Sequence, residues 1–156
     1  MKLLFCLLLT LGVFFMPSKN INQINNIQDC FNNSTTINLI IDGDFKTFNQ
    51  NSKQYTNLLN QFNTLLQNSH QMPALGVSID ELTKQEIKNG VWIQFNFDRV
   101  YKNSQMPFDG LLIKIENQSY GLNLIRKYNN KYDGRCFYLN LEIDTSNFYN
   151  ELLNIF

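Results

Sequence analysis

Histidine and the common catalytic signatures are scarce or missing in this sequence. His70 is the only histidine, so a metal site built from several histidines is excluded, and a Ser/His or Cys/His dyad would have to use His70 itself. The glycine-rich nucleotide loops, Gly-x-Ser-x-Gly, Cys-x-x-Cys and His-Glu-x-x-His do not occur in the 156 residues. We therefore expect no cofactor and no metal, and the sequence does not name a reaction.

Charged residues are also few, at 17%, against 44% hydrophobic and 13% aromatic residues. This balance predicts a folded chain, because enough apolar surface exists to offset the lost chain entropy. Asparagine occurs 24 times and alanine once, a bias that A/T-rich codons explain without prion-like behaviour. The net charge is zero, which gives no strong nucleic-acid signal, although a basic stretch over 99–135 lies between two acidic ones.

Residues 1–19 have the layout of a secretory signal peptide. Lys2 precedes 14 uncharged and mainly apolar residues, 3–16, a length that suits a signal-peptide core and is short for a transmembrane helix of about 20 residues. Large residues, Phe15 and Met16, stand where a cleavage site needs small ones, so an uncleaved anchor stays open. We expect a secreted or membrane-tethered protein; a cytoplasmic location, with 3–16 as an ordinary buried element, is the alternative.

Two cysteines follow this segment, Cys30 and Cys136. An oxidising compartment could join them, and closing so long a loop would add roughly 4 to 5 kcal/mol by chain-entropy arguments. Two unpaired thiols, one in a linker and one in a strand, are the alternative.

The body of the chain divides into a polar, Asn-rich linker over 20–36 and a single domain over 37–156. Residues 37–48 have the strand, Asp-Gly, strand form of a tight hairpin. A helix capped by Asn51 or Ser52 is predicted to run to about Asn68, followed by a strand over 74–79. A short helix over 80–89 follows, with capping-box spacing between Ser78 and Glu81.

From residue 91 the hydrophobic period changes to two. Strands are predicted over 91–98, 110–116, 119–127 and 135–143, with an irregular stretch over 99–109 and a final helix beginning at 144–146. Helices and strands do not alternate regularly. We therefore predict an α+β fold, with an antiparallel sheet made of the N-terminal hairpin and a C-terminal meander and with two or three helices packed on one face.

The most promising surface feature is the basic and aromatic stretch 126–135. Aromatic faces stack on sugars or bases while Arg and Asn donate hydrogen bonds. The chain has 10 lysines and only 3 arginines, so two arginines in one short stretch indicate a contact that needs the planar guanidinium group. The alternative to a binding role for residues 126–135 is an ordinary solvated loop. The alternative to an exposed binding role for Trp92 is burial under a helix. The candidate binding residues are Trp92, Tyr120, Asn123, Arg126, Arg135 and Tyr138.

These patterns favour a non-catalytic binding module for an unknown polar ligand or protein, with membrane contact only through the N-terminal segment. A small hydrolase is the alternative, in which Asp98, Asp109 or His70 activates water in a shared pocket. A structural subunit that docks on a partner through its apolar N-terminus is a third hypothesis.

Overall fold

The computed structural model describes residues 21–155, so the predictions made for 1–19 lie outside the described residues. The helices are η1 (Ile27–Asn33, a 3-10 helix), α1 (Lys53–Leu65), α2 (Asp80–Glu86) and α3 (Ser146–Ile155). The strands are β1 (Ile21–Gln23), β2 (Thr36–Ile41), β3 (Asp44–Asn49), β4 (His70–Met72), β5 (Val77–Ser78), β6 (Val91–Asn103), β7 (Met106–Lys114), β8 (Gly121–Lys127), β9 (Gly134–Arg135) and β10 (Phe137–Asn140).

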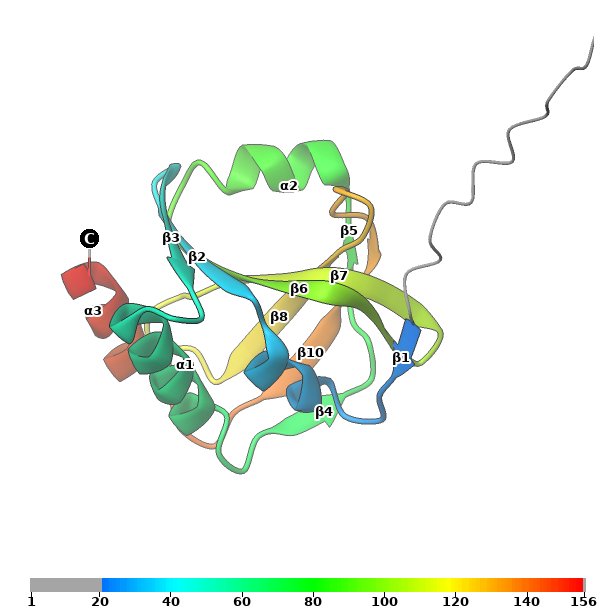
Figure 1. Ribbon diagram of the computed structural model, residues 1–156, viewed down its shortest axis with the longest axis horizontal. Helices are drawn as coiled ribbons and strands as arrows, with labels where there is room; N and C mark the ends of the chain where they lie inside the picture. Colours follow the sequence, from blue (N-terminus) through cyan, green and yellow to red (C-terminus); the bar gives the residue numbers. More distant parts are fainter. Residues whose placement is uncertain (1–20, 156) are drawn as a thin grey trace, which may run out of the picture.

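One large sheet with helices on both faces forms the body of the protein (Figure 1). Its strand order is β3-β2-β6-β7-β8-β10-β4, all antiparallel, and β1 adds a short parallel pairing to β6. The predicted α+β class, with an N-terminal hairpin and a C-terminal meander, is confirmed. Within 21–155, no helix combines the length and the apolar character needed to cross a membrane.

The first hairpin forms as its sequence predicts. Asp42 and Gly43, at φ 50° and 89°, make the turn between β2 and β3, where a two-residue loop needs positive φ at both positions. The second hairpin corrects the prediction, because β6 and β7 extend through the stretch 99–109 that was expected to be irregular. Ser104 and Gln105 make its turn, at φ 47° and 66°, and carry no Asn-Gly or Asp-Gly signature.

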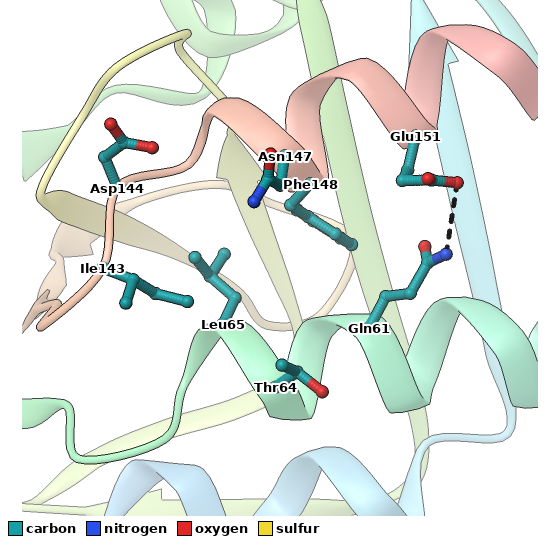
Figure 2. Close-up of a pocket in the computed structure, with 8 residues that line it drawn as sticks. All are labelled: Gln61, Thr64, Leu65, Ile143, Asp144, Asn147, Phe148 and Glu151. Atoms are coloured by element: carbon teal, nitrogen blue, oxygen red, sulfur yellow. Dashed lines mark hydrogen bonds between the residues drawn. The ribbon is translucent and has the colours of Figure 1, made fainter.

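The main core lies on the face of the sheet covered by η1, α1 and α3. Leu65 of α1 and Phe148 of α3 are both buried and project into the space between their helices (Figure 2). Ser52 caps α1, where its side chain accepts a hydrogen bond from the amide of Tyr55 at 3.1 Å, as predicted.

The expected linker over 20–36 is wrong, because this segment belongs to the core. Ile27, Cys30 and Phe31 of η1 are fully buried, and the ring of Phe31 lies 4.9 Å from the rings of both Phe62 and Phe95. Three apolar residues among many asparagines are enough to bury one side of a short helix, which the polar composition concealed.

The opposite face of the sheet carries a smaller core, which we call the second core: Ile40, Trp92, Leu112, Ile125 and Cys136. Ile87, which ends α2, packs against it together with Tyr132, and α2 lies over this face (Figure 1).

Two features near α2 differ from the sequence predictions. The strand expected over 74–79 is reduced to β5, and β4 forms before Pro73 instead. The capping box is also wrong, because Ser78 Oγ donates to the carbonyl of Gly134 at 3.1 Å and the N-cap of α2, Ile79, makes no side-chain cap bond.

Of the two alternatives for the cysteines, a disulfide or two unpaired thiols, the structure has the unpaired thiols. Cys30 and Cys136 are free, buried thiols. Cys30 belongs to the main core and Cys136 to the second core, so the sheet separates them. Burial raises the pKa of both thiols, because it disfavours the charged thiolate.

Phe31 provides a test of the role of η1. We expect Phe31→Ala to lower the free energy of unfolding by about 3–5 kcal/mol, because a fully buried ring is removed from an aromatic cluster. The neighbouring exposed substitution Asn32→Ala should change it by about 0.5 kcal/mol or less. Urea denaturation measures both, and equal stability of the two variants would contradict the assignment of η1 to the core.

Candidate functional site

A hollow of about 300 Å³ opens on the second-core face of the sheet; we call it the second-face hollow. Period-two alternation places its strand residues on this face, because Trp92, Asn123 and Tyr138 alternate with residues of the main core. Its lining residues are Trp92, Lys114, Glu116, Ser119, Gly121, Asn123, Ile125 and Tyr138.

Tyr138 lies across the sheet surface over Gly121. A Cβ placed on Gly121 would lie 1.9 Å from the Tyr138 hydroxyl oxygen, so only glycine leaves space for the phenol here. The hydroxyl of Ser119 organises the adjoining turn, donating to the carbonyl of Gly121 at 2.9 Å and accepting from its amide at 3.2 Å. The tyrosine ring therefore lies over Gly121 of β8 and is partly exposed at the edge of the hollow.

Trp92 contributes a buried wall of the hollow. Its side chain is 1% exposed, and its indole Nε1 donates to the carbonyl of Asn89 at 2.8 Å, so its polar atom is satisfied. Lys114, opposite Trp92 in the β6–β7 register, places its Nζ 5.6 Å from the indole centroid and 3.7 Å from Glu116. The hollow thus has an aromatic wall beside a half-exposed cation and a carboxylate.

Arg126 donates hydrogen bonds to backbone carbonyls and does not line the hollow. Its Nη1, Nε and Nη2 donate to the carbonyls of Pro107, Arg135 and Asp133 at 2.8, 2.7 and 3.2 Å. Its partial burial lowers the pKa of the guanidinium, because desolvation disfavours its charge. The planar fork of arginine explains why lysine does not serve here.

Two further residues of the basic and aromatic stretch, Tyr132 and Asp133, bond to the start of α2. Asp133 Oδ1 accepts the amide of Asp80 at 2.9 Å, and Asp80 Oδ1 accepts the amide of Tyr132 at 2.9 Å. Tyr132 also donates its hydroxyl to Gln94 Oε1 at 2.5 Å, and its burial raises the pKa of the phenol. Asp133 therefore supplies the cap that α2 lacks, and the stretch 128–135 is fastened to the fold.

The six residues selected from the sequence separate into two groups. Trp92, Asn123 and Tyr138 line the second-face hollow. Arg126 and Arg135 bond backbone carbonyls, the latter that of Ala74 at 3.3 Å, and Tyr120 is 57% exposed beside the hollow without lining it. Alternation along β8 explains why Arg126 does not line the hollow, since Asn123 and Arg126 point to different sides of the strand.

Lys114, Glu116, Ser119 and Gly121 line the hollow but were not selected as binding residues. Lys114 and Gly121 share the parity of the residues on the second-core face of their strands, so pairing β7 with β6 and β8 with β10 would have identified them. Glu116 and Ser119 lie in the connection between β7 and β8, where sequence alternation gives no information.

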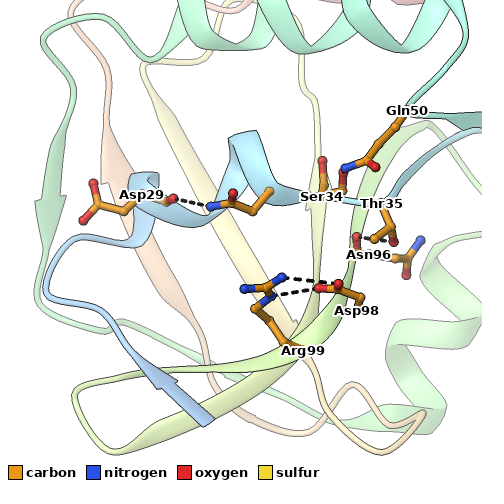
Figure 3. Close-up of polar contacts among 8 residues, drawn as sticks. Asp29, Ser34, Thr35, Gln50, Asn96, Asp98 and Arg99 are labelled. Carbon is orange, nitrogen blue, oxygen red and sulfur yellow. Dashed lines mark hydrogen bonds and ion pairs between the residues drawn. The ribbon is translucent and has the colours of Figure 1, made fainter. Parts of the chain in front are cut away.

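Two of the three groups proposed for a hydrolase, Asp98 and His70, lie in different surroundings. Asp98 forms an ion pair with Arg99, at 2.9 Å between Oδ1 and Nε (Figure 3), and this hydrogen bond lowers the pKa of the carboxyl group. Asp98 lies two residues after Asn96, whose backbone carbonyl accepts a hydrogen bond from Thr35 Oγ1 at 3.1 Å. His70 lines a different hollow with Asn68, Asn140, Leu141 and Glu142, which includes neither aspartate.

Comparisons with known proteins add no constraint: no protein-family model, no curated protein and no solved structure matches this chain. Among residues 21–155, no group of three or more His, Cys, Asp or Glu side chains is placed to hold a metal ion.

Gly121 and Tyr138 can be tested as a pair. We expect Gly121→Ala to destabilise the protein by about 1–3 kcal/mol, because the new methyl group overlaps the phenol. Tyr138→Ala in the same chain should remove most of that cost, since the overlapping atoms are gone. A double-mutant cycle in urea measures the coupling, and additive effects of the two substitutions would contradict the packing of Tyr138 on Gly121.

Proposed function

We propose that this protein is a non-catalytic binding module and that the second-face hollow is its ligand site. The observation that carries the proposal is the lining: an indole wall, a half-exposed phenol, an amide, and a lysine beside a glutamate around one hollow of about 300 Å³. Such a mixture of apolar surface and a few orienting polar groups is typical of small-molecule sites.

The lining favours a compact, uncharged polar ligand with a flat or apolar face. Lys114 and Glu116 lie 3.7 Å apart, so their charges largely cancel at the distance of a ligand. Asn123 supplies both donors and an acceptor, and the Tyr138 hydroxyl supplies one of each. A monosaccharide or a nucleoside has the size and the alternating polar and apolar faces that fit these groups.

The ligand proposal can be tested through the intrinsic fluorescence of Trp92, the only tryptophan of the chain. The probes are glucose, galactose, N-acetylglucosamine, adenosine and uridine. We expect at least one probe to change the emission saturably, because Trp92 forms a wall of the hollow. Asn123→Ala and Tyr138→Ala should each raise its dissociation constant about three- to tenfold, the cost of one hydrogen bond.

Asn57→Ala, an exposed substitution on α1, is the matched control and should leave the titration unchanged. A probe that binds both hollow variants as tightly as the unaltered protein would place the site elsewhere. A panel without any saturable binding would contradict the proposed ligand class.

We further propose that the module is exported or held at a membrane by residues 1–19. Support comes from the order of a basic residue, 14 uncharged residues and a polar segment. Since Cys30 and Cys136 are unpaired, the proposal depends on this segment alone.

Amino-terminal sequencing of the native protein, after cell fractionation, tests its compartment and processing together. We expect either a chain shortened by about 15–30 residues outside the cell, as for a cleaved signal peptide, or the full chain in the membrane fraction. A full-length chain confined to the soluble cytoplasmic fraction would contradict export and favour the structural-subunit hypothesis.

A further inference from the structure

Large apolar side chains lie exposed along β5 and the first turn of α2; we call this surface the β5 strip. Its members are Leu75, Val77, Ile79 and Leu82, each more than half exposed. Within the described residues, β5 pairs only with β9, so no strand lies along its other edge. A group of exposed apolar side chains of this kind marks an interaction surface.

The β5 strip belongs to the same end of the domain as β1. β1 pairs with β6 as far as Lys102, and Lys102 pairs with Pro107 of β7. Arg126 connects this end of β7 to β9, because it donates to the carbonyls of both Pro107 and Arg135. Arg135 in turn pairs with Val77 of β5. Figure 1 shows β1 and β5 on one side of the molecule and β3 on the other.

The position of β1 in the chain limits how far this end of the domain can lie from a membrane anchor. Only residues 17–20 separate the apolar segment 3–16 from Ile21, where β1 begins, and four residues span at most about 14 Å. Crossing the headgroup region of a bilayer takes about 5–7 Å of that length. A folded domain of this size has a radius of gyration of about 14 Å. With residues 3–16 in a bilayer, the β1 end must therefore lie against the lipid surface.

We propose that the β5 strip, together with Ile21, docks the domain on the lipid surface in which residues 3–16 are anchored. This inference rests on the membrane-held form of the proposed function. Ile21 is itself 60% exposed. The apolar side chains enter the boundary between headgroups and acyl chains, as those of interfacial helices do, and apolar area is thereby removed from water.

Arg135 supplies a polar contact for the same surface. It is exposed and stands opposite Val77 in the pairing of β9 with β5. One of its N–H groups donates to the carbonyl of Ala74 at 3.3 Å, and a guanidinium group has five such donors. Lipid phosphates suit these donors, which gives this arginine a role that the second-face hollow does not.

A lipid surface fits the β5 strip better than a strand of a second copy does. β5 contains two residues, and Gly76, at φ 75°, interrupts the extended backbone directly before it. So short an edge offers little backbone for pairing between chains. A lipid surface requires no strand register, and the short connection to residues 3–16 holds it within reach.

The test uses the full chain in phosphatidylcholine nanodiscs that carry a gadolinium chelate on some headgroups, with the broadening of amide signals as the readout. We expect the strongest broadening at Ile21 and over 75–79, and the weakest on β3, because broadening falls steeply with distance from the headgroups. Broadening that is equal on β3 and β5, or stronger on β3, would overturn the proposal.

A charged double variant tests the strip itself. Val77→Glu combined with Ile79→Glu should shift the equilibrium between docked and undocked domain at least about tenfold toward the undocked state, because two apolar contacts with lipid are lost. Phe45→Glu is the matched control, since Phe45 is 70% exposed on β3, and it should leave the broadening over 75–79 unchanged. Equal broadening over 75–79 in the double variant and the control would contradict docking through the strip.

A longer connection separates docking by the strip from contact imposed by the short connection. A Gly-Ser linker of about 20 residues inserted between Asn20 and Ile21 has a root-mean-square length of about 25 Å. We expect the broadening over 75–79 to persist in this variant. Its decline to the level of β3 would assign the contact to the connection alone and overturn the proposal.

Failure of the anchor and failure of the docking give different results. A full chain that does not enter the nanodiscs contradicts the membrane-held form of the proposed function, and this inference with it. An anchored chain without broadening over 75–79 contradicts the docking alone. If that chain also self-associates through the β5 strip, the occupant is a second copy and the lipid proposal is overturned.

Discussion

The central strand β6 is buried on both of its faces, and this burial decides where the helices must lie. Ile93 and Phe95 enter the main core, while Trp92 and Gln94, on the alternate positions, are buried on the other side. A strand buried on both faces requires cover above and below the sheet. The main-core side receives η1, α1 and α3, whereas the second core receives α2, a helix of seven residues, and the stretch 128–135. The second-face hollow is the part of that face that this limited cover leaves open.

The limited cover is itself held by long-range contacts. A helix as short as α2 has little stability of its own, and its N-cap makes no side-chain bond. The carboxylate of Asp133 accepts a hydrogen bond from the amide of Asp80, and the carboxylate of Asp80 accepts one from the amide of Tyr132. The hydroxyl of Tyr132 also donates to the side chain of Gln94, which is buried on β6. The basic and aromatic stretch is thereby used to close the second core. Its side chains resemble a ligand-binding loop in composition because both tasks need aromatic area together with directional hydrogen bonds.

Local signals in the sequence predicted the elements whose causes are local. Asp42-Gly43, the Ser52 cap and the alternation that begins at Val91 each contain the reason for their structure within a few residues. The features that the sequence did not predict have causes that lie far away along the chain. Phe31 is buried by Phe62 and Phe95, and the cap of α2 comes from a residue 53 positions away from Asp80. For the candidate site, the sequence selected Trp92, Asn123 and Tyr138, but the neighbours Lys114 and Gly121 follow only from strand pairing.

The second-face hollow, as the proposed ligand site, has little net charge with which to select a ligand. Lys114 and Glu116 oppose each other at 3.7 Å, so the field at a bound molecule would be small and selection would have to come from shape and from directional hydrogen bonds. Two aromatic side chains set the shape: Trp92 is buried, with its indole Nε1 bonded to the carbonyl of Asn89, and Tyr138 lies over Gly121, where no larger residue leaves space for its phenol. The exposed amide of Asn123 supplies the directional hydrogen bonds. The same contacts that complete the second core therefore also define the geometry to which a ligand would have to conform.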